Sequence, residues 1–115
     1  MSATPRPIAL ITGASAGIGR EFAGQLAGVG YDLVLVARNA ERLRAVADEL
    51  QRQYGVACEV LAADLARDDD TARVTARLDV GNIDLLVNNA GFGTKGTLAR
   101  ASRDGQEAML RVHVL

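Results

Sequence analysis

The stretch TGASAGIG occupies residues 12–19 and decides the fold. It follows the short apolar run IALIT at residues 8–12, which is typical of a buried strand that ends at Gly13. Beyond it, apolar residues recur at steps of four, four and three, which predicts a helix over residues 17–28. The apolar stripe of that helix consists of Ile18, Phe22, Leu26 and Val29. The glycines therefore lie in a tight turn that leads from a strand into a helix.

The same alternation of short apolar runs with helical spacing continues along the chain. Further strands are predicted over residues 31–37, 56–62 and 83–87. A helix between the first two of these is capped by Asn39 and ends before Gly55. Its inner face is made of Leu43, Val46, Ala47 and Leu50.

A third helix is predicted over residues 68–79, with acidic residues in its first turn, where the helix dipole favours them. A last helix begins at Ser102 or Asp104 and still runs at Leu115. The inner face of the third helix is made of Thr71, Val74, Thr75 and Leu78.

Four apolar strands, each followed by helical spacing, indicate βαβ units, which close with right-handed crossovers into a parallel sheet. Helices should cover both faces of such a sheet. The predicted fold is therefore α/β: a doubly wound parallel sheet of about four strands between two helical layers. No repeat or linker interrupts residues 1–115, so one domain is expected.

The composition excludes several classes of function. Thirteen Lys and Arg against fourteen Asp and Glu give a net charge of −1, which argues against a nucleic-acid or membrane surface. No stretch approaches the ~20 apolar residues that a spanning helix needs. One cysteine, Cys58, and one histidine, His113, provide no cluster with metal-ligand spacing. We expect a soluble, cytoplasmic protein without a metal, in which Cys58 is a core residue.

The glycine pattern points to phosphate binding. Gly13, Gly17 and Gly19 permit backbone angles closed to other residues and let a pyrophosphate approach the main chain. The N–H groups at the start of the helix, at residues 17–19, would then meet the phosphates. The alternative is an ordinary glycine-rich turn between a strand and a helix.

The end of the second strand favours NADP over NAD. A dinucleotide-binding unit reads the adenosine ribose there, and an acid would take its 2′-hydroxyl. The residues at that place are Ala37 and Arg38, and a guanidinium suits a 2′-phosphate instead. Ser15 could add a hydroxyl contact to the same phosphate or ribose. The alternative for Arg38 is a solvated surface arginine.

Two further loops follow strands. Asp64 comes just past the third strand, where it could accept from an adenine amino group, or else cap the next turn. The sequence NNAG at residues 88–91 follows the fourth strand and suits either a loop against a flat ligand or a plain turn.

Taken together, these residues resemble the short-chain dehydrogenase/reductase family in its TGxxxGxG form, over essentially the whole chain. The resemblance implies a Rossmann-type sheet and reversible hydride transfer between NADP(H) and a small carbonyl compound or alcohol. It places Gly13, Ser15, Gly17, Ile18 and Gly19 at the pyrophosphate loop. It also places Arg38 at the NADP-selecting position, Asp64 and Leu65 at the adenine contact, and Asn89, Ala90 and Gly91 in the loop lining the cofactor.

The chain departs from the family at the active site. The family uses a Ser and a Tyr-x-x-x-Lys pair, whereas Tyr31 and Tyr54 are followed at the fourth residue by Leu35 and Cys58. The resemblance therefore covers the amino-terminal half of the family domain, and we expect the chain to be truncated at its carboxyl end. His113 stands where the family places a catalytic Asn. It is either a proton-relay residue or a histidine packed on the last helix.

Truncation would leave the far edge of the fourth strand bare, so the chain alone should be marginally stable or self-associate. Two other functions stay open: a nucleotide-binding module without catalysis, and a scaffold that recruits a partner through the bare edge. The substrate is not readable, although Phe92, Thr94 and Lys95 could touch its edge.

Overall fold

The computed structural model describes residues 5–89 and the backbone of residues 111–114. Its strands are β1 (Ile8–Thr12), β2 (Asp32–Ala37), β3 (Cys58–Ala62), β4 (Leu85–Asn88) and β5 (Arg111–Val114). They form one sheet in the order β3-β2-β1-β4-β5. The first four strands are parallel, and β5 pairs antiparallel with β4. The predicted parallel sheet of four strands is confirmed.

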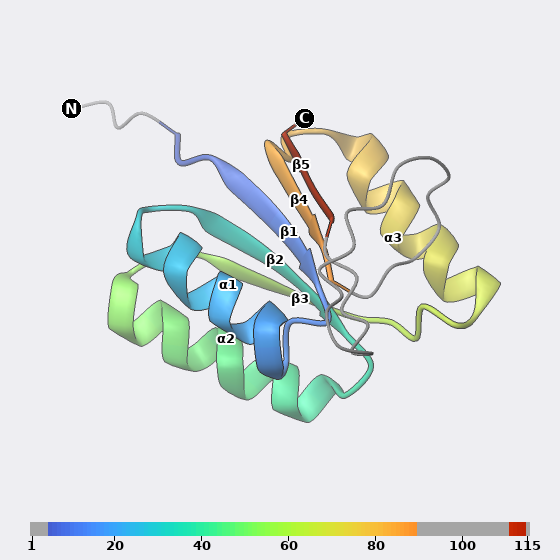
Figure 1. Ribbon diagram of the computed structural model, residues 1–115, viewed down its shortest axis with the longest axis horizontal. Coiled ribbons are helices and arrows are strands. Elements are labelled where there is room, and N and C mark those ends of the chain that lie inside the picture. Colours follow the sequence, from blue (N-terminus) through green and yellow to red (C-terminus); the bar gives the residue numbers. More distant parts are fainter. Residues whose placement is uncertain (1–4, 90–110, 115) are drawn as a thin grey trace, which may run out of the picture.

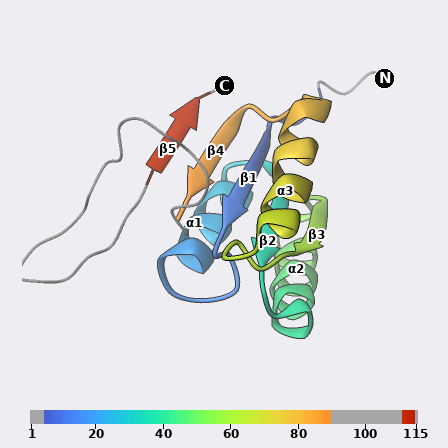
Figure 2. The same cartoon turned by 90° about the vertical axis from the view of Figure 1, so that its right-hand side faces the viewer.

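Three helices cover the two faces of this sheet, which gives three layers. They are α1 (Gly17–Gly28), α2 (Ala40–Tyr54) and α3 (Asp68–Val80). Helices α1 and α2 lie together on one face and α3 lies on the other, as Figures 1 and 2 show. The layers hold two apolar clusters, one on each side of the sheet. One cluster joins Ala9, Ile11 and Leu33 to α1 and α2, and the other joins Leu10, Val34 and Val74.

The ends of α2 follow the sequence closely. The side chain of Asn39 accepts a hydrogen bond from the backbone N–H of Arg42 at 3.0 Å, and Gly55 ends the helix with a left-handed backbone (φ 72°). The four residues predicted for its inner face are all buried. Cap, face and terminating glycine therefore agree with the prediction.

The apolar stripe predicted for α1 is only partly correct. Ile18 is 46% exposed and Val29 is 74% exposed, whereas the buried residues of the helix are Gly19, Ala23 and Ala27. Small side chains on the inner face let the helix axis lie close to the sheet. Phe22 and Leu26 then pack at the flanks of this contact, each partly buried.

The predicted last helix is wrong for the residues that the structure describes there. Residues 111–114 form β5, and 102–110 lie outside the described residues. The alternation Arg-Val-His-Val suits a strand as well as a helix end, and pairing along β4 supplies the backbone hydrogen bonds. The far edge of β4 is therefore covered, so the expected bare edge, which was the reason to expect self-association, is also wrong.

Among the helices within residues 5–89, none is both long and apolar enough to cross a membrane. The same residues bring together no group of three His, Cys, Asp or Glu side chains that could hold a metal ion.

A buried polar pair joins the two central strands. Thr12 and Asn88, at the ends of β1 and β4, are both fully buried, and the Thr12 hydroxyl donates to the Asn88 side-chain oxygen at 3.0 Å. They are register partners in the sheet. The pair fixes the ends of β1 and β4 side by side, where the two loops that follow them begin.

Replacing Thr12 with Val should destabilise the protein, because it keeps the shape of the side chain but leaves the Asn88 oxygen without this donor. We expect a loss of about 1–3 kcal/mol in the free energy of unfolding. Urea denaturation followed by circular dichroism measures it, with Thr75→Val on the exposed side of α3 as the control. Equal stability of the two variants would contradict this role for the pair.

Candidate functional site

The site lies where the order of the strands in the sheet reverses. From β1 the chain builds β2 and β3 on one side, then returns to place β4 on the other side. The carboxyl ends of β1 and β4 therefore lie side by side at the point where the strand order reverses, which is where open α/β sheets bind their ligands. The glycine turn leaves β1 at this point, and Asn89 leaves β4 beside it.

The turn after β1 is built on close backbone contacts. Gly13 and Gly17 have left-handed backbones, with φ of 67° and 60°. A Cβ on Gly19 would lie 2.1 Å from the carbonyl oxygen of Gly13, so residue 19 has no room for a side chain. By contrast, a Cβ on Gly17 would meet no atom of the described residues within 4 Å, so within this part of the chain the space beside the turn is open. The glycines therefore shape the turn and leave its outer side accessible.

Two contacts fix the turn from either side. The backbone N–H of Ala14 donates to the carbonyl of Val36 at the end of β2, at 3.1 Å. On the other side is the Asn89 carboxamide, whose nitrogen would lie 2.9 Å from a Cβ on Gly13 and 3.1 Å from one on Gly19. The turn is thus held between the ends of β2 and β4.

The amino terminus of α1 is ready to receive an anion. Its capping residue, Ala16, provides no side-chain hydrogen bond, and its first turn holds no acid. The N–H groups of residues 17–19 donate to no described residue. Helix α2 is capped by Asn39 with Glu41 in its first turn, and α3 begins with three aspartates. The positive end of the α1 dipole is therefore the one left without a negative partner among the described residues.

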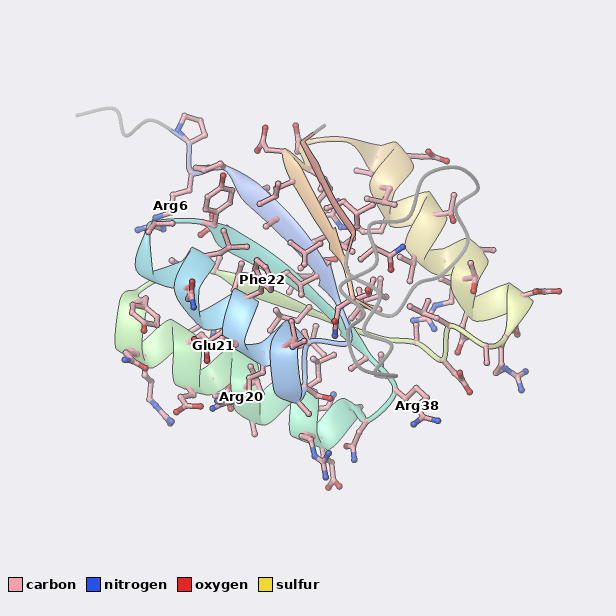
Figure 3. The ribbon with its side chains drawn as sticks, in the orientation of Figure 1. Arg6, Arg20, Glu21, Phe22 and Arg38 are labelled. Carbon is pink, nitrogen blue, oxygen red and sulfur yellow. The ribbon has the colours of Figure 1, made fainter. Side chains whose placement is uncertain are left out.

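Arg38 follows β2 directly and its side chain is exposed, pointing away from the end of the sheet in Figure 3. Within the described part of the chain it forms neither a hydrogen bond nor an ion pair, whereas Arg20 on α1 pairs with Glu49. Its guanidinium is free to bind an anion near the glycine turn, which the Ala14 to Val36 hydrogen bond joins to the same strand end.

Asp64 and Leu65 follow β3 and are half-buried. One carboxylate oxygen of Asp64 accepts from the N–H of Ala66 at 3.0 Å, which closes a tight turn. Asp64 thus caps the next turn, as the alternative prediction has it, whereas the residue at the cap position of α3 is Arg67. The other carboxylate oxygen accepts no hydrogen bond from the described residues, so it can serve a ligand.

Sequence reasoning missed the side chains that hold this turn. Asp70 accepts from the N–H of Asp64 at 2.7 Å, and Thr71 donates to the carbonyl of Leu65 at 3.2 Å. The bond from the Asp64 N–H is the largest cause that lowers the pKa of Asp70, and Arg73 adds to it. Both aspartates can be read in the sequence, but an acid at residue 70 is already explained by the helix dipole. Its bond to Asp64 was therefore not predicted.

Other predicted residues are placed only in part. Ser15 is half-buried in the glycine turn, and Ile18 is exposed at the start of α1. Ala90 and Gly91 lie outside the described residues, as do Phe92, Thr94 and Lys95. His113 lies in β5 and pairs with Leu86 of β4, whereas Asn88 pairs with Arg111. Its part in proton transfer stays a prediction.

The family model described as short chain dehydrogenase matches residues 7–115. The chain belongs to the short-chain dehydrogenase family. The matched region corresponds to the amino-terminal half of family members, as predicted.

Individual relatives agree with this assignment. A very-long-chain 3-oxoacyl-CoA reductase from Podospora anserina is 46% identical over 89 residues, covering 72% of this chain and 25% of the relative. A short-chain dehydrogenase from Sphingobium yanoikuyae, solved with NADPH, is 50% identical with a TM-score of 0.72, covering 78% of this chain and 36% of that one. A bulky-bulky ketone specific alcohol dehydrogenase from Comamonas testosteroni is 44% identical with a TM-score of 0.73, covering 81% and 38%. The chain thus spans about a quarter of the length of the curated relatives it matches.

Substituting Gly19 with Ala should disrupt the short-chain dehydrogenase turn, because the new Cβ would meet the Gly13 carbonyl at 2.1 Å. Nothing can yield there except the backbone that forms the anion site. We expect lower stability and at least about a tenfold loss of affinity for NADPH, since the phosphate-facing N–H groups would move. Fluorescence titration and thermal melting measure these two effects.

The control for this substitution is Gly24→Ala in the same helix, where a Cβ would meet nothing within 4 Å. It should leave NADPH affinity unchanged and raise stability by up to about 1 kcal/mol, because alanine favours a helix over glycine. If the two variants behave alike, the close contact at Gly19 does not shape the site.

Cys58 was predicted to be a core residue; it is half-buried and packs against the core, and it should be unreactive as a nucleophile. Burial, with a smaller contribution from the charge of Asp32, raises the pKa of its thiol to about 11. At pH 8 the thiolate is then about 100-fold rarer than for a cysteine with the ordinary pKa near 9. Reaction with a chromogenic disulfide should accelerate by about that factor in denaturant, and equal rates would refute the shift.

Proposed function

We propose that this chain binds NADP(H) and provides the cofactor-binding half of a short-chain oxidoreductase, which transfers hydride between NADP(H) and a carbonyl compound or alcohol. The observation that carries the proposal is the pair of unneutralised positive groups at one sheet edge. These are the uncapped amino terminus of α1 and the guanidinium of Arg38.

Different residues of this chain would bind different parts of the cofactor. The N–H groups of Gly17, Ile18 and Gly19 would bind the pyrophosphate, and the open space beside Gly17 admits it. Arg38, with Ser15, would bind the 2′-phosphate of the adenosine ribose. The cofactor, when bound, supplies or accepts the hydride, and Asn89 with the residues after it would line its binding crevice.

The absence of an acid at the end of β2 favours NADP over NAD. Ala37 is 8% exposed, and the next side chain, Arg38, carries the opposite charge to the acid that would accept from a ribose 2′-hydroxyl. The relative solved with NADPH supports the same choice. The names of the other relatives, a 3-oxoacyl-CoA reductase and a bulky-ketone alcohol dehydrogenase, support a carbonyl substrate without fixing its size.

A second candidate is a module that binds NADP(H) without catalysing hydride transfer by itself. It is favoured by the sequence, in which neither Tyr31 nor Tyr54 has a lysine four residues later. The intact mass of the protein from its native source, with an NADPH oxidation assay on the same sample, separates the two. A chain near twice 12.1 kDa that oxidises NADPH supports the enzyme, and a 12.1 kDa chain that only binds it supports the module.

Arg38→Ala should weaken NADPH binding selectively. Loss of charge-assisted hydrogen bonds to the 2′-phosphate costs about 1.5–3 kcal/mol, which is about 10–150-fold in the dissociation constant. Binding of NADH, which lacks that phosphate, should be unchanged. Fluorescence titration of both nucleotides measures the ratio of the two affinities.

The matched control is Arg44→Ala, which removes an exposed arginine from α2 and should change neither affinity. If the unmodified protein binds neither nucleotide, the proposed function fails. If it prefers NADH, cofactor binding stands and the assignment of Arg38 to the 2′-phosphate fails.

A further inference from the structure

The first turns of α3 reach back to the end of β3 through three side chains. Asp70 accepts from the backbone N–H of Asp64 at 2.7 Å. Thr71 donates to the carbonyl of Leu65 at 3.2 Å, and Arg73 donates to the carbonyl of Ala62, the last residue of β3, at 3.0 Å. Helix α3 therefore holds the last residue of β3 and two residues of the loop that follows it, Asp64 and Leu65.

Asp70 is the centre of this arrangement. Its second carboxylate oxygen accepts from Arg73 at 3.3 Å, so one carboxylate joins the loop backbone to the residue that holds the strand end. Its side chain is 21% exposed, against 71% for the neighbouring Asp69. Among the described residues, Asp69 bonds only to the helix start, through the N–H of Asp70 and the side chain of Arg67.

The bond to the Asp64 N–H decides how Asp64 presents its own side chain. With its N–H held by Asp70 and one carboxylate oxygen held by the N–H of Ala66, the backbone and side chain of Asp64 are both fixed. The remaining oxygen has no donor among the described residues. A carboxylate fixed in this way can accept from a ligand without first losing rotational freedom.

We propose that Asp70, supported by Arg73, is a positioning residue that holds Asp64 in the orientation needed to accept a hydrogen bond from the amino group of an adenine ring. This inference rests on the proposed function, because it takes the nucleotide to be bound at this sheet edge. Asp70 itself touches no part of the cofactor.

The pKa of Asp70 is lowered, first by the bond from the Asp64 N–H and then by Arg73, which agrees with a carboxylate held by these two partners. A charge that served only the α3 dipole would need neither of these partners. Asp68, two residues before Asp70, is exposed and makes no hydrogen bond or ion pair with a described residue. It therefore serves as the matched control for dipole charge alone.

The experiment compares two cofactors that differ at one group. The first is NADPH, and the second is the reduced purine analogue, in which a hydrogen atom replaces the adenine amino group. Dissociation constants for both are measured by fluorescence in the 115-residue protein and in the variants Asp70→Ala, Asp70→Asn and Asp68→Ala, with thermal melting to confirm folding.

The ratio of the two constants reports the contact between Asp64 and the amino group. We expect the unmodified protein to prefer NADPH by about threefold to tenfold, the value of one hydrogen bond. Asp70→Ala should bring this ratio close to one, and Asp68→Ala should leave it unchanged. Asp70→Asn can still accept from the Asp64 N–H, so it should keep a larger part of the preference than Asp70→Ala.

A purely structural role for Asp70 gives a different result, because general loosening weakens both cofactors equally and preserves their ratio. That outcome would overturn the inference, as would an unmodified protein that binds NADPH without preferring it to the analogue. In both cases the proposed function would stand. Failure of the unmodified protein to bind either cofactor would overturn the proposed function and this inference together.

Discussion

The contact between the Gly19 position and the Gly13 carbonyl constrains the rest of the structure. Because Gly19 has no side chain, the first turn of α1 can pass directly over the end of β1. The small inner face of the helix, Gly19, Ala23 and Ala27, continues the same close approach along the sheet. Close packing therefore begins at the turn and continues along the inner face of α1.

Charge is distributed unevenly among the starts of the three described helices. Helices α2 and α3 satisfy theirs internally, through Asn39 in one case and through acidic residues in the other. Helix α1 does not, although capping would stabilise it by about 1 kcal/mol. A fold that gives up this stabilisation at one terminus keeps an anion site available there. The exposed guanidinium of Arg38, at the neighbouring strand end, has the same character.

Most of this architecture was predictable because its signals are local. Asn39 and Gly55 define α2 through their own side chain or backbone, and the glycine turn needs only residues 13–19. Strand β3 begins two residues later than predicted, and the N–H groups of Ala57 and Cys58 at its start donate to the side chains of Asp32 and Gln51. Those acceptors come from other elements, and spacing along the chain does not reveal them.

The same reason explains what was missed. The helical stripe of α1 failed because the distance between helix and sheet, rather than hydropathy, selects the buried residues. The prediction of a helix at residues 111–114 failed because these residues pair with β4, which is a contact between distant parts of the chain. The prediction of an adenine contact at Asp64 gave no hint that Asp70 would hold its backbone, since the two are joined only when α3 folds back on β3.

The site is therefore assembled from strand ends whose relative positions the sheet fixes. Thr12 and Asn88 join β1 to β4, the Ala14 to Val36 bond joins the glycine turn to β2, and Asp70 joins the β3 loop to α3. The glycine turn and Asp64, both expected to meet the cofactor, are thus held by neighbouring residues, whereas Arg38 makes no such bond with a described residue. Because a shift of about 1 Å in a positioned group can cost about 100-fold in rate, these supports would matter to the proposed function as much as the contacting residues.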